Sequence, residues 1–214
     1  AGVDEIYKIG GAQAIAAQLQ LSTKAGDRAL LLFPSGLPFI AAYWGCLYAG
    51  VIPVPSYAPR AGRAASRVEA IVADASPAIA LTDVLDPRLL EKRIGAQREL
   101  GDMRWLATSQ IDRRLAADWR TPSLRRDTLA LLQYTSGSTR TPHGVKVSHA
   151  HLLHNLALAS HGIAINAEDV CVSWAPLYHD MGLIWGVLQP IYSGMPLVLM
   201  SPTAFAERPA SWLE

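Results

Sequence analysis

The segment ALLLFPSGLPFIAAYWGCLYAGVIPVPSYAP, residues 29–59, decides the fold because it contains no charged residue along its whole length. Such a length raises the question of a membrane span, but prolines and glycines interrupt the segment at short intervals. We therefore interpret it as a buried strand over residues 28–33, a helix over residues 37–49 that ends at Gly50, and a second buried strand over residues 51–54.

The alternation of short apolar runs and longer amphipathic runs continues after this segment. Residues 64–75 predict a helix and residues 78–82 predict another strand. The short runs ALLLF, VIPV and AIALT are apolar throughout, which is typical of strands that lie between helices on both faces. The sequence therefore predicts an α/β fold with mostly parallel sheets covered by helices on both faces.

The same pattern resumes after a polar, Arg-rich span over residues 102–127, which we interpret as a surface connection. The predicted elements are strands over residues 129–134, 145–148 and 170–174, and a helix over residues 149–161 that Ser148 caps. Polar loops follow the strands at 129–134 and 170–174. Because ligands bind beyond the carboxyl ends of strands in open parallel sheets, these loops are the candidate site.

Bulk composition excludes several classes of protein. The chain has 214 residues, half of them hydrophobic, and a net charge of +1 with both signs interspersed. This composition predicts a globular fold and gives no one-sided basic field for binding nucleic acid. Cys46 and Cys171 do not form a disulfide framework, and residues 1–10 do not resemble a secretory signal, so we expect a reducing cytoplasm.

The first polar loop, residues 134–144, reads YTSGSTRTPHG and contains five Ser or Thr hydroxyls and two glycines. Hydroxyls and backbone N–H groups beside glycines can surround a polyphosphate with donors. Arg140 adds a planar cation suited to phosphate oxygens. The loop is not a Walker A sequence, because no Gly-Lys-Ser/Thr ends it. From composition alone, a flexible surface turn is the alternative interpretation.

The second polar segment, residues 174–182, reads WAPLYHDMG. A ring N–H of His179 can hydrogen-bond to an oxygen that carries developing charge, and Asp180 can orient that ring or cap the next helix. The alternative for His179 is a partly buried histidine beside a helix N-cap. All six histidines lie between positions 143 and 179, but without an HExxH pattern or a Cys or carboxylate cluster we predict no protein metal site.

These two segments resemble the motifs of the adenylate-forming superfamily. Residues 135–144 match its TSGSTGxPKG loop at eight of ten positions, with Arg140 in place of Gly and His143 in place of Lys. An Arg at the first of these positions resembles the loop of the fatty-acyl-AMP ligase branch. Residues 174–182 resemble the LPLYHDMG segment of the family, and residues 183–190 continue in the manner of the same branch. The resemblance begins near Gly26 and extends over nearly the whole chain.

The resemblance implies that residues 1–214 are part of the large N-terminal AMP-binding domain of an adenylate-forming enzyme, without its C-terminal lid. It implies activation of a fatty acid with ATP to acyl-adenylate and pyrophosphate, for transfer to an acyl carrier protein in lipid or polyketide synthesis. Mg²⁺ would arrive with ATP, held mainly by phosphate oxygens and water. We expect the fragment by itself to have little activity.

Site residues follow from the same resemblance. The ATP phosphates would contact Thr135, Ser136, Gly137, Ser138, Thr139, Arg140, His143 and Gly144. The residues expected near the acyl carboxylate are His179, Asp180, Met181, Gly182 and Trp185, and the catalytic side chains are His179 and Arg140. We also expect Gly186 to leave space beside the motif that Trp185 could fill.

Three questions stay open at this point. The acceptor could be coenzyme A, as in an acyl-CoA ligase, and the chain could equally be an adenylation domain. His143 in place of lysine gives some support to a non-catalytic scaffold that only retains the fold. Apolar positions in the helix at 149–161, namely Leu152, Leu153, Leu156 and Leu158, could line an acyl tunnel, although core packing is the commoner use of such spacing.

Overall fold

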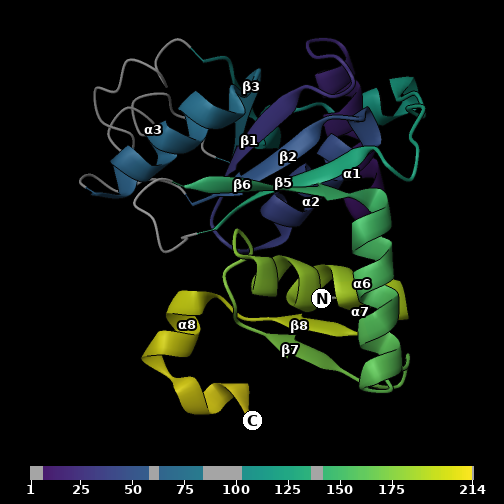
Figure 1. Ribbon diagram of the computed structural model, residues 1–214, viewed down its shortest axis with the longest axis vertical. Coiled ribbons are helices and arrows are strands. Elements are labelled where there is room, and N and C mark those ends of the chain that lie inside the picture. The colour runs from purple at the N-terminus through teal and green to yellow at the C-terminus, as the bar shows by residue number, and fades with distance from the viewer. Residues whose placement is uncertain (1–6, 58–62, 84–102, 136–141, 214) are drawn as a thin grey trace.

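The computed structural model describes residues 7–57, 63–83, 103–135 and 142–213. Its first half is an α/β unit built on one parallel sheet in the order β2-β1-β3-β4 (Figure 1). The strands are β1 (Arg28–Leu32), β2 (Ile52–Ser56), β3 (Ile79–Thr82) and β4 (Trp105–Ala107). Leu30 of β1 pairs with Val54 on one side and with Ala80 on the other.

Helices cover this sheet on both faces, as the uninterrupted apolar strands predict. Leu31 and Phe33 pack into one buried cluster with α1 (Tyr7–Gln20) and α2 (Leu37–Ala49). Leu30 and Leu32 point to the opposite face, where they pack with α3 (Arg63–Ala75). Because side chains alternate along a strand, a run that is apolar at every position needs a cover on each side. The predicted α/β class is confirmed.

Local signals also place several boundaries correctly. Gly50 ends α2 in the left-handed conformation, with φ 73°, and Ser148 caps α6 (His149–Gly162) by accepting a hydrogen bond from the backbone N–H of His151. Strands β5 (Leu129–Thr135), β6 (His143–Ser148) and β7 (Cys171–Ser173) lie where the sequence predicts them, within one or two residues at each end.

The span at 102–127, predicted to be a surface connection, also contributes a strand to the sheet. Residues 105–107 form β4, which pairs in parallel with β3, and the short 3-10 turns η2 (Thr108–Gln110) and η3 (Arg113–Asp118) follow it. Trp105 and Leu106 are half-buried and pack against the two core clusters. A strand of three residues is too short to give a periodic pattern, so the sequence does not reveal it.

The second half of the chain folds around a smaller pair of strands. Helix α6 runs from the end of β6 past α7 towards β7 (Figure 1). The remaining elements are the π-helix η4 (Met181–Leu188), α7 (Gln189–Ser193), β8 (Leu197–Leu199), α8 (Pro202–Glu207) and the 3-10 turn η5 (Pro209–Trp212). Strand β8 pairs in parallel with β7. None of the helices described is long and apolar enough to cross a membrane.

Candidate functional site

The phosphate-type loop connects two antiparallel strands, β5 and β6. Thr135 pairs with His143 and Tyr134 pairs with Gly144, so these four residues form the base of the loop. Antiparallel pairing suits this connection because a short loop can join such strands, whereas parallel strands need a long crossover. The predicted residues Ser136, Gly137, Ser138, Thr139 and Arg140 lie outside the described residues, and their roles remain predictions.

Tyr134 holds the base of this loop against α3. Its hydroxyl donates a hydrogen bond to Oδ2 of Asp74 at 2.5 Å. Burial raises the pKa of Tyr134, and the Asp74 carboxylate raises it further, so the phenol remains a donor at neutral pH. A Cβ atom at Gly144 would lie 2.9 Å from Cζ of Tyr134. Glycine at position 144 therefore leaves room for the tyrosine ring that Asp74 holds in place.

The His179 segment is a tight turn between β7 and η4. The backbone N–H of His179 donates to the Pro176 carbonyl at 3.0 Å. Asp180 accepts from the backbone N–H of Met181 at 2.8 Å, which caps η4, and its Oδ1 lies 2.5 Å from Nδ1 of His179. Asp180 thus contacts both the ring and the helix start. The His179 side chain is 61% exposed, so the ring is accessible to a substrate.

Two glycines allow η4 to pack closely against the chain that precedes it. A Cβ atom at Gly182 would lie 2.1 Å from the Pro176 carbonyl oxygen, and one at Gly186 would lie 2.5 Å from Oγ of Ser173. The space beside Gly186 is thus taken by Ser173, while Trp185 is 43% exposed. The expectation that Trp185 fills space beside Gly186 stays a prediction. A π-helix of this kind is frequent at functional sites.

Three residues that lie far from it in the sequence hold the His179 segment in place. The Gln133 side-chain amide donates to the Tyr178 carbonyl at 3.0 Å, and the Leu177 N–H donates to Oγ of Ser35 at 3.1 Å. The Tyr57 ring lies 5.5 Å, centroid to centroid, from that of Tyr178. Each of these three residues lies at or just after the carboxyl end of a strand, β5, β1 or β2. Two of these contacts place the His179 segment beside the carboxyl ends of β1 and β2, the edge where parallel sheets bind ligands.

The sequence interpretation missed these supporting residues. Gln133 is the polar residue in the otherwise apolar run LALLQY, directly before the loop, and that position was the available signal. Ser35 and Tyr57 give no comparable signal, because their role depends on a contact with a segment more than 100 residues away in the sequence.

Titratable groups outside the two motifs do not form a second reactive centre in the described parts of the chain. No group of three or more His, Cys, Asp or Glu side chains able to hold a metal ion occurs there. Cys46 is fully buried, and burial raises its pKa far above the range in which a reactive thiolate forms.

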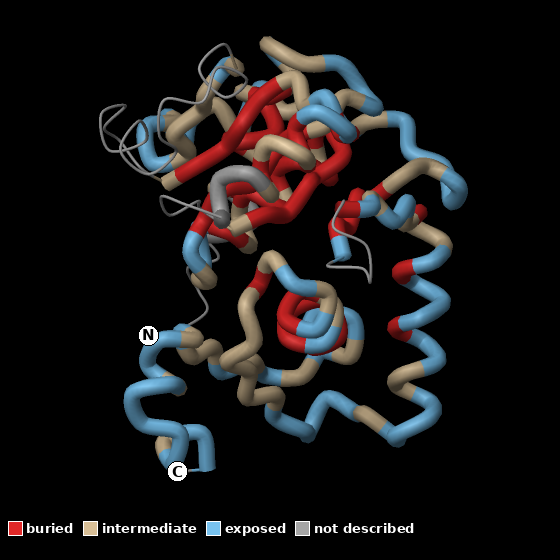
Figure 2. Tube along the Cα trace, turned by 60° about the vertical axis from the view of Figure 1, so that its left-hand side comes forward, coloured by how far each residue is buried: buried red, intermediate tan, exposed pale blue. Residues whose placement is uncertain are grey.

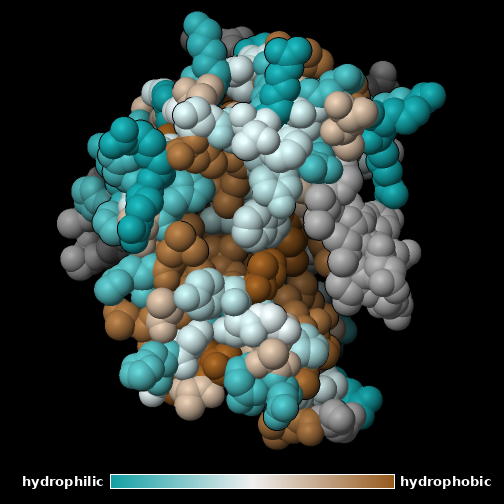
Figure 3. All heavy atoms as spheres, turned by 90° about the vertical axis from the view of Figure 1, so that its right-hand side faces the viewer, coloured by the Kyte–Doolittle hydropathy of each residue, from teal (hydrophilic) through white to brown (hydrophobic). Residues whose placement is uncertain are grey.

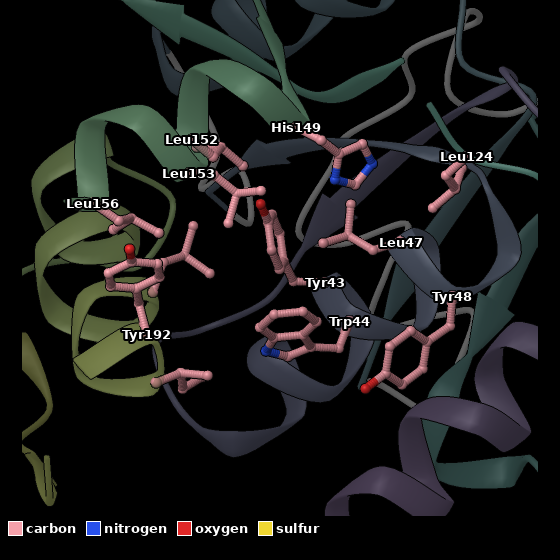
Figure 4. Close-up of a pocket in the computed structure, with 12 residues that line it drawn as sticks. Tyr43, Trp44, Leu47, Tyr48, Leu124, His149, Leu152, Leu153, Leu156 and Tyr192 are labelled. Carbon is pink, nitrogen blue, oxygen red and sulfur yellow. The ribbon is translucent and has the colours of Figure 1, made fainter. Parts of the chain in front are cut away.

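An apolar groove of about 310 Å³ lies between α2, α6 and α7. Figure 4 shows Tyr43 projecting from α2 towards Leu153 of α6, with the Trp44 ring below it. Of the helix positions considered for an acyl tunnel, Leu152 and Leu156 are buried in the core, whereas Leu153 and Leu158 are exposed. Apolar residues also gather across the middle of the face seen in Figure 3.

This groove lies away from the phosphate-type loop. Its wall includes His149, which begins α6 next to the start of β5, whereas the loop follows the end of β5. Strand β5 has seven residues, which correspond to about 20 Å. The groove is therefore a separate feature of the surface.

Known proteins share this arrangement. Over 207 residues the chain is 42% identical to the medium-chain-fatty-acid–[acyl-carrier-protein] ligase JamA of Moorena producens, an alignment that covers 95% of this chain and 35% of JamA. It is 38% identical over 206 residues to the long-chain-fatty-acid–AMP ligase FadD23 of Mycobacterium tuberculosis, covering 94% and 35% of the two chains. The chain thus spans about a third of the length of these relatives.

A solved structure gives the same result in three dimensions. The fatty acyl-adenylate ligase from Legionella pneumophila, in complex with acyl adenylate and pyrophosphate, matches with a TM-score of 0.86 and 41% identity, covering 96% of this chain and 35% of that one. The sequence profile of the AMP-binding enzymes matches residues 11–214, a stretch that includes both motifs and every strand described above. The chain therefore belongs to the AMP-binding enzyme family.

Proposed function

We propose that this chain is the N-terminal part of a longer fatty-acyl-AMP ligase, an enzyme that joins a fatty acid to AMP. The observation that carries the proposal is the hydrogen bond from Gln133, in β5 just ahead of the loop, to the Tyr178 carbonyl in the second motif. This contact links the strand that leads into a loop rich in phosphate donors to the segment that carries an accessible imidazole. Similarity to relatives that are named fatty-acid ligases supports the choice of substrate.

In the proposed reaction, an oxygen of the fatty acid carboxylate attacks the α-phosphorus of ATP, and the bond to pyrophosphate breaks. Backbone N–H groups and hydroxyls of residues 135–144 bind the β- and γ-phosphates. Arg140 supplies the positive charge that the family's usual lysine, replaced here by His143, would bring to the phosphates. His179 donates a hydrogen bond to oxygen near the reacting carboxylate. No protein nucleophile is needed, because positioning and charge stabilisation suffice.

The donor set of the loop fits a polyphosphate, and ATP brings its own divalent cation. Mg²⁺ would neutralise charge on the phosphate oxygens, which together with water supply most of its ligands. Among the described residues, the one carboxylate in contact with the His179 ring is Asp180, and its Oδ1 already lies against the imidazole. The protein would therefore contribute few ligands, in keeping with an ion that enters with its nucleotide.

The proposal extends to the second step and to the missing parts. The acyl group passes to the phosphopantetheine thiol of an acyl carrier protein, in the cytoplasm, using a C-terminal lid domain that lies beyond residues 1–214. The carrier-protein acceptor is favoured by the likeness to JamA. A coenzyme A acceptor is the alternative, and the presence of Arg140 in the loop counts against it.

The test is formation of acyl-adenylate from labelled fatty acids and ATP by the full-length protein. Wild type, Arg140→Ala and His179→Ala are compared, with coenzyme A and a carrier protein added in parallel reactions. We expect wild type to accumulate acyl-AMP and ignore coenzyme A, and each variant to lose at least about tenfold in rate, or about 1.4 kcal/mol of transition-state stabilisation.

Exposed Arg113→Ala, in η3 and remote from both motifs, is the matched control for Arg140→Ala and should leave the rate unchanged. Acyl-CoA as the product would establish the synthetase alternative. No adenylate with any acid, together with no ATP binding, would favour the scaffold.

A further inference from the structure

Consecutive side chains at the end of β5 attach this strand to opposite sides of the molecule. Tyr134 points to α3, where it binds Asp74, and Gln133 points to the other face, where it binds the Tyr178 carbonyl. The loop with phosphate donors begins at the next residue, Thr135. Any movement of the His179 segment relative to this loop must therefore strain the bond made by Gln133.

We infer that Gln133 is a positioning residue for adenylate formation, which sets the distance between the phosphate-binding loop and His179 by holding the carbonyl of Tyr178. The inference rests on the proposed function for its kinetic consequence. The contact itself depends only on the described residues, and nothing in the two sequence motifs assigns a role to this glutamine.

Burial argues against a purely structural role for this amide. Gln133 is 6% exposed and its neighbours on the same face belong to an apolar core cluster, so a leucine or methionine would suit the position better. A buried amide costs free energy unless its polar atoms are bonded. Only Nε2 has a partner among the described residues, while Oε1 is buried without one. An apolar side chain would avoid this cost, and the one bond that is made goes to the His179 segment.

The bond acts on His179 through the planar peptide that joins it to Tyr178. Since the carbonyl of Tyr178 and the N–H of His179 belong to the same rigid unit, holding the first fixes the direction of the second. The N–H of His179 also donates to the Pro176 carbonyl at 3.0 Å. Because both the carbonyl and the N–H of this peptide are hydrogen-bonded, the Cα atom of His179, which carries the imidazole, is held in place relative to β5. Asp180 then sets the orientation of the ring.

A second buried glutamine in the same fold provides the control. Gln189 is 1% exposed, and its amide donates to Oγ of Ser160 at 2.8 Å and to Oγ of Ser193 at 2.9 Å. These contacts join α6 to α7 and touch neither motif. Replacing either glutamine by methionine removes a buried amide of the same size, but only Gln133→Met releases the Tyr178 carbonyl.

The experiment compares Gln133→Met, Gln133→Glu and Gln189→Met in the full-length protein. Thermal unfolding measures stability, and steady-state kinetics of acyl-AMP formation give kcat and the KM for ATP and for the fatty acid. We expect Gln133→Met to lower kcat by about tenfold, with a smaller change in either KM. Gln133→Glu should behave in the same way at a pH where the new side chain is ionised, because a carboxylate cannot donate to a carbonyl. Gln189→Met should alter only the stability.

A double variant tests whether Gln133 acts through His179. Adding Gln133→Met to His179→Ala should cause little further loss, because the residue that it positions is already gone. Losses that multiply, or a kcat for Gln133→Met equal to that of Gln189→Met, would overturn the inference.

A direct readout separates this inference from the proposed function. The ring resonances of His179, followed by NMR, should shift in Gln133→Met and stay unchanged in Gln189→Met. If wild type forms no adenylate but the resonances shift, the proposed function fails and the positioning role stands. Unchanged resonances would overturn the positioning role, whatever the activity.

Discussion

The two halves of the molecule use similar apolar strands in different surroundings. Strands β1, β2 and β3 are buried at nearly every position, whereas β7 and β8 are half-buried or exposed throughout (Figure 2). The first set belongs to a four-stranded sheet with helices on both faces, and the second forms a two-stranded sheet in the part of the chain that the structure describes. Apolar composition alone therefore does not set burial; the number of layers around a strand does.

This difference separates stability from function. The first half contains most of the large, fully buried side chains, and so it supplies most of the burial energy. The second half carries the accessible His179 and exposes several apolar side chains, among them Ile191, Val198 and Trp212. Its tight packing is concentrated at one place, the turn that leads into η4. Three substitutions test this division.

The largest effect is expected for Leu31→Ala in β1. Leu31 is fully buried, so the lost burial and the cavity should cost about 3 kcal/mol of the free energy of unfolding. The same change in β8, Leu199→Ala, removes a half-buried side chain and should cost about 1 kcal/mol. Urea unfolding of both variants gives the two values. Equal losses would contradict the division into a buried half and an open half.

An intermediate effect is expected for Gly182→Ala in the His179 turn. The new Cβ atom would meet the Pro176 carbonyl oxygen at 2.1 Å, and backbone on both sides cannot give way as a flexible side chain could. Such overpacking costs about 2 kcal/mol and should displace His179, so that acyl-AMP formation falls at least tenfold.

Gly162→Ala is the control, because no atom lies within 4 Å of the position of its Cβ and alanine favours the helix end. The rate of acyl-AMP formation and the thermal unfolding of Gly182→Ala and Gly162→Ala are compared to test this prediction. Wild-type activity in Gly182→Ala would mean that the turn is looser than its contacts indicate.

The smallest effect is expected where the two halves meet, at His149 in the wall of the groove. Burial lowers the pKa of His149 from its ordinary value of 6.5. The unfolded chain therefore takes up a proton before the folded chain does, and the free energy of unfolding falls as the pH drops through 6.5 towards the lowered pKa. Thermal unfolding at pH 7.5 and 5.5 should show a smaller drop for His149→Gln than for wild type. If exposed His154→Gln produces the same reduction, burial of His149 is not the cause.

Much of the fold could be predicted because its signals are local. The uncharged run at 29–59, Gly50 at the end of α2 and Ser148 at the start of α6 each act within a few residues. Helix α1 gave no such signal, since its buried positions are mainly alanines and its apolar residues are spread around the helix. Strand β4 was missed because three residues cannot establish a period.

The sequence by itself determined the α/β class, the positions of the main strands along the chain and the two motifs, because periodicity, caps and motif letters are properties of neighbouring residues. Only the tertiary structure decided that Gln133, Ser35 and Tyr57 support the His179 segment, and that Gly144 and Gly182 are needed for close packing. The physical reason is distance along the chain. A hydrogen bond between residues 133 and 178, or a ring lying against a glycine, exists only once the strands have brought the partners together.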